Sequence, residues 1–155
     1  MTDGDREILD DFTRTRAKTI ELVSRLPDDY LSRTANGEEH SVGWLFGHIA
    51  QAVDYWMENC MKDPRPRFAM TDQDKASILQ ALEVSCDRLV SFFSADDGAP
   101  LGRTFSRVRK DTGAEESFTG RNRVVYITQH EAHHRGKIVL ALRQWGFTYI
   151  PFLPY

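Results

Sequence analysis

Three histidines lie at helical spacing on apolar stretches of this sequence. His130 and His134 are four residues apart, so their imidazoles project from one side of a helix and can hold a common metal ion. On a helical wheel counted from Val124 they lie at about 240° and 280°, beside the apolar stripe, whereas His133 lies at about 180° on the flank. His48 is the remaining histidine on an apolar helix face. We predict it as the third ligand, because packing two apolar faces together brings their helices to about 8 to 10 Å.

A structural use of histidine competes with this interpretation. A lone histidine on an apolar face is more often a hydrogen-bonded core residue. Three of them favour a metal, because each unpaired buried nitrogen costs about 1 to 3 kcal/mol and one ion satisfies a nitrogen of every ring. Three neutral ligands leave one coordination position open, as in catalytic zinc sites. Zinc and nickel are the first candidates, and iron, manganese and cobalt also accept imidazole.

Glu131 lies beside the histidine pair, at about 340° on the same wheel. It is a candidate general base or a group that orients a ligand imidazole, and the structural alternative is an ion pair with an arginine. His130 to His134 also satisfies the H-E-x-x-H pattern of zinc metalloproteases. No Asp, Glu or His follows His134, so the downstream ligand of that class is missing and a protease is disfavoured.

Four helices are expected to position these residues. Helical periodicity predicts a helix over about residues 5–25, a second after the N-cap Ser41, a third that buries Ile78 to Phe93, and a fourth over about residues 121–145. Thr71 and Asp74 resemble a capping box for the third helix. Residues 104–108, followed by a turn sequence, predict a short hairpin before the fourth helix. The fold class is therefore all-α, a bundle of four helices.

Bulk composition limits the remaining choices. With 155 residues and 41% hydrophobic content, we expect one domain over residues 1–155. A net charge of −3 offers no basic excess for nucleic acid or an anionic membrane. No targeting segment or membrane span is evident, and Cys60 and Cys86 are predicted to be free thiols in a reducing cytoplasm.

Two further groups of residues carry expectations. Residues 147–155 are too apolar to be left in water, so we expect them to pack on the bundle or on a second subunit. Arg121, Arg123 and Arg135 are candidates for attracting an anionic substrate, although helix arginines are usually only solvated. His40 and His133 are expected to be exposed or to support the ligands without binding the ion.

The order of these motifs resembles the DinB-like family. The resemblance runs from Gly47-His48-Ile49 on the second helix, through H-x-x-x-H-R-G at His130 to Gly136, to the proline-containing aromatic tail, and covers nearly the whole chain. It implies a four-helix bundle of up-down-down-up topology, often a homodimer, with a metal site at one end formed by His48, His130 and His134. Relatives commonly carry glutamine after the H-R-G motif, where this chain has Lys137, so a role for a neutral amide there does not carry over.

The resemblance also implies a chemistry. Some relatives are similar to thiol-dependent transferases or isomerases, in which a metal binds the thiol of a low-molecular-weight cofactor. We therefore predict a metal-dependent enzyme that conjugates a small electrophile with a thiol, in detoxification or stress response. A divalent ion behind three neutral ligands can ionise a bound thiol or bring bound water to a pKa of ~7. Two alternatives stay open: a non-catalytic metal-binding module of the stress response, and a hydrolase that uses Glu131.

Overall fold

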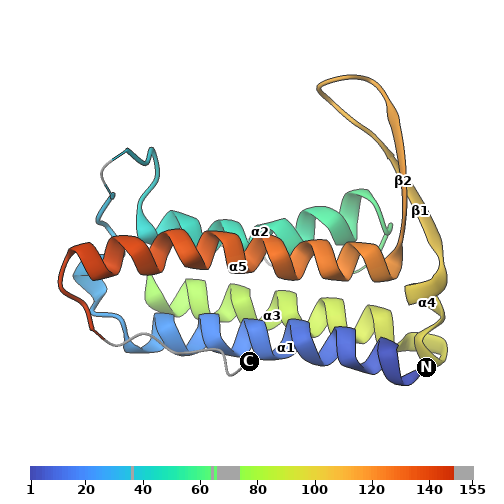
Figure 1. The fold of residues 1–155 in the computed structure, drawn as a ribbon, viewed down its shortest axis with the longest axis horizontal. Helices are drawn as coiled ribbons and strands as arrows, with labels where there is room; N and C mark the ends of the chain where they lie inside the picture. The colour runs from blue at the N-terminus through green and yellow to red at the C-terminus, as the bar shows by residue number, and fades with distance from the viewer. Residues whose placement is uncertain (36, 64, 66–73, 149–155) are drawn as a thin grey trace.

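Four long helices lie side by side in an elongated bundle (Figure 1). The computed structural model describes residues 1–35, 37–63, 65 and 74–148. The long helices are α1 (Asp3–Arg25), α2 (Val42–Asn59), α3 (Lys75–Ser94) and α5 (Gly120–Gln144). The predicted all-α four-helix class is confirmed.

The helices follow an up-down-down-up course. α1 and α5 run in one direction, and α2 and α3 run in the other (Figure 1). Lys75, at the start of α3, forms an ion pair of 2.6 Å with Asp28 in the short helix η1 (Asp28–Tyr30) that follows α1. Trp145, just after α5, packs edge-on against Tyr30 with ring centroids 6.0 Å apart. The topology implied by the family resemblance is confirmed.

Each long helix begins at a side chain that accepts a hydrogen bond from the first turn. These N-caps are Thr2, Ser41, Asp74 and Thr119. A cap of this kind contributes about 1 kcal/mol. The prediction of Ser41 as the N-cap of α2 is confirmed. The predicted capping box of Thr71 and Asp74 at the start of α3 is wrong. Asp74 is itself the N-cap, because its carboxylate accepts from the Ser77 N–H at 2.9 Å, and Thr71 lies outside the described residues.

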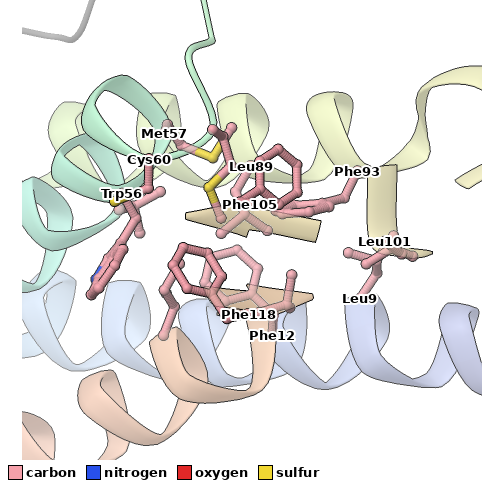
Figure 2. Close-up of a cluster of buried hydrophobic side chains, with 14 residues drawn as sticks. Leu9, Phe12, Trp56, Met57, Cys60, Leu89, Phe93, Leu101, Phe105 and Phe118 are labelled. Atoms are coloured by element: carbon pink, nitrogen blue, oxygen red, sulfur yellow. The ribbon is translucent and has the colours of Figure 1, made fainter. Parts of the chain in front are cut away.

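A hairpin joins α3 to α5, as predicted. It follows the short helices η2 (Ala95–Gly98) and α4 (Ala99–Gly102), and consists of β1 (Thr104–Val108) paired antiparallel with β2 (Glu115–Thr119). The hairpin projects from one end of the bundle (Figure 1). Its cross-strand pair Phe105 and Phe118 lies among the buried side chains of Phe12 and Leu89 (Figure 2). The base of the hairpin thus closes that end of the core.

The hydrophobic core is divided into two clusters along the bundle axis. The cluster at the hairpin end includes Phe12, Trp56 and Leu89 (Figure 2). Ile127 also belongs to it. The cluster at the other end includes Leu22, Ile49, Leu82 and Ile138. Between them, α1, α3 and α5 bury polar side chains: Arg16, Thr19, Ser85, Glu131 and Arg135. The apolar clusters hold the helices together, at roughly 1.5 to 3 kcal/mol for each fully buried large side chain, and leave a polar layer near mid-length.

The remaining expectations concern the cysteines and the tail. Cys60 is buried and Cys86 is partly buried, and both are free. Burial raises the pKa of both thiols, so neither is activated.

Phe147 packs against Tyr30 at 5.7 Å between ring centroids, so the start of the apolar tail contacts the bundle as expected. Residues 149–155 lie outside the described part of the chain. Among the described residues, no helix has the length and apolarity needed to cross a membrane.

Candidate metal centre

The three predicted ligands come from two helices that pack against each other. His48 lies in the second turn of α2, downstream of the Ser41 cap. His130 and His134 lie near the middle of α5, between Ile127 of one hydrophobic cluster and Ile138 of the other. The site therefore lies beside the polar layer at mid-length. The resemblance implied a site at one end of the bundle, and this detail is wrong for this chain because apolar clusters extend to both sides of the histidines.

The imidazoles converge closely. One ligand nitrogen of each ring lies within 4.8 Å of the other two. The Nε2 atoms of His130 and His134 are 3.1 Å apart. The ring centroid of His48 lies 5.1 Å from that of His130 and 4.7 Å from that of His134. The structure thus brings together the three residues that the sequence singled out.

This arrangement fits a divalent ion. Two imidazole nitrogens bound to one ion at 2.0 to 2.1 Å are separated by about 3.0 to 3.4 Å, and the His130 and His134 pair already has this spacing. The remaining spacings, all within 4.8 Å, close to that range with side-chain movements on the order of 1 Å. Nδ1 of His134, the ring nitrogen that does not face His130, is buried and has no hydrogen-bond partner among the described residues, and an ion held by Nε2 would not contact it. Three imidazole nitrogens grouped this closely suit a borderline cation such as zinc or nickel.

Burial keeps these imidazoles in the form that binds metals. The pKa of His130 and that of His134 are each lowered to about 4, first by burial and then by the neighbouring histidines, with the charge of Lys137 contributing at His134. Burial also lowers the pKa of His48, and the charge of His40 adds to this effect. At neutral pH all three side chains are therefore neutral and available as ligands.

The other two histidines lie at the edge of the site. His40 is exposed and stacks on Trp44 with ring centroids 3.5 Å apart, and the opposite neighbour of Trp44 is His48 at 4.9 Å, also stacked. His133 is exposed and meets His134 edge-on at 5.2 Å. Neither belongs to the group of potential ligands among the described residues. The helical wheel therefore separated His133 from its neighbours correctly.

Comparison with known proteins assigns the family. A sequence model of the DinB superfamily matches residues 11–138. The chain belongs to the DinB superfamily. The matched range contains all three clustered histidines and most of the four long helices. Among curated proteins, no significant match to the sequence was found.

Solved structures of DinB-like proteins share the fold. A DinB-like protein from Bacillus cereus ATCC 10987 is 16% identical, with a TM-score of 0.74 and coverage of 95% of both chains. A DinB-like protein from Bacillus subtilis is 21% identical, with a TM-score of 0.69 and coverage of 94% of this chain and 96% of its own. At these identities the likeness shows the fold alone.

Glu131 of this DinB superfamily member faces α1, away from His48. Its Oε2 accepts from Nε of Arg16 at 2.9 Å, and its Oε1 accepts from the Thr19 hydroxyl at 2.6 Å. Both Arg16 and Glu131 are 1% exposed. The structure thus places Glu131 in the ion pair that the sequence analysis gave as the alternative to catalysis.

The partners of Glu131 were not identified from the sequence. Arg16 also donates to the Leu82 carbonyl and to the Ser85 hydroxyl, so it links α1, α3 and α5. Arg135 donates to the Thr15 carbonyl and to the Thr19 hydroxyl. A signal was present: Arg16 is four residues after Phe12 and three before Thr19, on the apolar face of α1.

The three arginines predicted to attract an anionic substrate bind or pack against other parts of the bundle. Arg121 forms an ion pair with Asp5 at the start of α1 and lowers the pKa of that carboxyl. The Arg123 guanidinium is buried against the rings of Trp56 and Phe118, at 3.7 and 3.8 Å from their centroids. With Arg135 bound to α1, none of the three is directed at the histidines. The expectation that they attract substrate is not supported by these contacts.

The histidine cluster lies outside the groove between α1 and α5. A groove of about 570 Å³ between α1 and α5 is lined by Gly4, Ile8, Val125 and Gln129, among others, and by none of the clustered histidines. The three histidines are partly exposed, so the cluster faces solvent between α2 and α5. A ligand would therefore reach the site from the α2 and α5 side.

Proposed function

We propose that this protein is a metal-dependent enzyme that transfers a thiol to a small electrophile. The observation that carries the proposal is the convergence of His48, His130 and His134, with ligand nitrogens within 4.8 Å, on a partly exposed face. Three imidazoles would hold a divalent ion and leave at least one position for an exogenous ligand. Zinc and nickel are the first candidates for the ion.

The expected chemistry divides between the ion and the chain. When bound, a divalent ion supplies the Lewis acidity that lowers the pKa of a coordinated thiol, so that a thiolate is present at neutral pH. The thiolate sulfur forms a bond to the electrophilic carbon, whose leaving group departs with the bonding electron pair. The histidines hold the site in place, and the packed clusters on either side exclude water from their buried faces. The Arg16 and Glu131 pair fixes the rotation of α5 about its axis.

These contacts favour thiol transfer over a hydrolase that uses Glu131. A general base must reach the proton that it abstracts, at about 2.6 to 3.2 Å or through one water. Both carboxylate oxygens of Glu131 are instead engaged by Arg16 and Thr19. Catalysis by Glu131 stays a hypothesis, and Glu131→Gln with unchanged turnover would argue against it.

The test is conjugation by the metal-loaded protein. The protein is loaded with zinc or nickel, and the rate of reaction between a model electrophile and glutathione, bacillithiol, mycothiol or coenzyme A is measured. We expect a metal-dependent rate with at least one thiol, lost in His48→Ala and retained in the exposed control His133→Ala. Failure with all four thiols in the metal-loaded protein would overturn the proposal.

One observation supports a second candidate, a metal-binding module without turnover. The histidines join α2 to α5, so an ion there would brace the bundle whether or not chemistry follows. This candidate predicts that metal raises the melting temperature while no thiol or hydrolytic substrate reacts. The single domain over residues 1–155, the cytoplasmic location, the homodimer and the role in stress response stay predictions.

A further inference from the structure

Lys137 lies on the same side of α5 as the candidate ligands. It follows His134 by three residues, and on the wheel it lies at about 220°, next to His130 at about 240°. Its side chain is 39% exposed, so the ammonium is at the surface of the site. Its charge acts on His134, as noted above, so the two groups are within electrostatic reach.

The partner of Lys137 comes from the segment that precedes α2. Nζ of Lys137 lies 2.9 Å from Oε1 and 3.0 Å from Oε2 of Glu38, whose side chain is 28% exposed. A bridge between Thr34 and Ser41 closes this segment into a tight loop. His40 belongs to the same loop and stacks on Trp44, which in turn stacks on His48. The ion pair and the stack thus border the metal site from one loop.

The charges around the site favour an anionic ligand. Three neutral imidazoles would leave the two positive charges of an ion uncompensated. Glu131 is already bound to Arg16, and Glu38 is bound to Lys137. A partly exposed ion pair contributes little to stability, so a ligand carboxylate can replace Glu38 at small cost. The long, flexible lysine side chain can follow such a ligand, whereas Arg121, Arg123 and Arg135 are held elsewhere.

We propose that Lys137 is a specificity-determining residue that binds the carboxylate of an anionic thiol while the thiol occupies the open position on the metal, with Glu38 as the competing internal anion. This inference rests on the proposed function, because it names the class of thiol that the same site takes. In the ligand-free state Glu38 neutralises Lys137. On binding, the carboxylate of the ligand takes the place of Glu38.

The experiment compares two thiols of nearly the same shape. Cobalt(II)-loaded protein is titrated with 3-mercaptopropionate and with its neutral analogue 3-mercaptopropionamide, and the sulfur-to-cobalt charge-transfer band reports binding of each. We expect the wild type to prefer the carboxylate by roughly five-fold. Lys137→Gln should abolish the preference, Lys137→Arg should retain most of it, and Glu38→Gln should increase it. Lys18→Gln is the matched control, because Lys18 forms a similar half-exposed pair with Glu21 on α1 and should change nothing.

The outcomes separate this inference from the proposed function. Equal affinity of the wild type for both thiols, or a preference that survives in Lys137→Gln, overturns the role of Lys137 and leaves thiol binding at the metal intact. Absence of the charge-transfer band with both thiols, in protein that holds cobalt, overturns the proposed thiol chemistry and this inference with it. The preference should also shrink as ionic strength rises, because the pair is exposed.

Discussion

α5 carries two polar clusters at the same level of the bundle, and they differ in exposure and in the groups that face their polar atoms. On the side toward α1, Glu131 accepts hydrogen bonds from Arg16 and Thr19 at 2.9 and 2.6 Å. On the side toward α2, the Nε2 atoms of His130 and His134 lie 3.1 Å apart, and both side chains are partly exposed. In the first cluster both carboxylate oxygens are held by protein groups, although Nη2 of Arg16 is buried without a hydrogen-bond partner among the described residues. The second cluster faces solvent and can take a ligand.

This difference distinguishes a structural cluster from a candidate site. Buried charges persist in a fold when they are paired and hydrogen-bonded, as Glu131 and Arg16 are. The three imidazoles are instead partly exposed, and one ligand nitrogen of each lies within 4.8 Å of the other two, so an added divalent ion can bind all three. Changes on the α1 side should therefore affect stability, and changes on the α2 side should affect metal binding.

The largest expected effect is on the α1 side. Glu131→Ala leaves the Arg16 guanidinium buried without its carboxylate, and should lower the free energy of unfolding by about 3 to 5 kcal/mol. Urea denaturation of the metal-free protein measures this change. A loss below about 1 kcal/mol would show that the pair does not hold α5 against α1.

The second effect is on the α2 side. His134→Ala removes one of three ligands and should weaken binding of zinc by more than about 100-fold, because removing even a group that only orients a ligand costs 10- to 100-fold. The unfolding free energy of the metal-free variant should change by about 1 kcal/mol or less. Competition with a chromophoric chelator measures the affinity, and His133→Ala is the control. Equal zinc affinity of His134→Ala and the wild type would exclude His134 as a ligand.

The third effect is a pH dependence of the metal-free protein. The pKa values of His130 and His134 are about 4 in the folded chain and 6.5 when unperturbed, so between these values the unfolded state binds more protons. Stability should be unaffected by these groups above pH 6.5 and should fall as the pH decreases from 6.5 to 4. Denaturation at several pH values tests this, and the double variant His130→Gln and His134→Gln should show a shallower decline. A decline of the same steepness in that variant would assign it to other groups.

The smallest effect serves as a control for the comparison. Thr119 caps α5 far from the histidines by accepting from the Asn122 N–H at 3.2 Å. Thr119→Ala should lower the unfolding free energy by about 1 kcal/mol and leave the zinc affinity unchanged. A large loss of zinc affinity in this variant would mean that metal binding follows global stability, and the two sides of α5 would no longer be separable.

Local patterns predicted most of the fold. The period of apolar residues located the four helices, and the turn after Val108 located the hairpin. The start of α3 was misplaced because Thr71 and Asp74 both suit a cap, and only the hydrogen bond from Ser77 distinguishes them. The course of the four helices came from the family resemblance, since periodicity in one helix contains no information on its direction relative to another.

The histidine cluster was predictable, and the cluster opposite it was not. Spacing on one helix placed His130 and His134 together, and His48 followed because apolar faces pack on each other. The burial of Arg16 was not predicted, because arginines on helices are usually solvated. Its partner Glu131 is 115 residues away in the sequence. Pairings of this range depend on the assembled bundle.

The most direct test of the central claim is X-ray absorption spectroscopy of the zinc-loaded protein. We predict one zinc per chain, with three imidazole nitrogens at about 2.0 to 2.1 Å and one exogenous ligand. The His48→Ala variant should lose one imidazole from the scattering or fail to retain zinc. A first shell made only of oxygen, or an unchanged spectrum in that variant, would contradict the account.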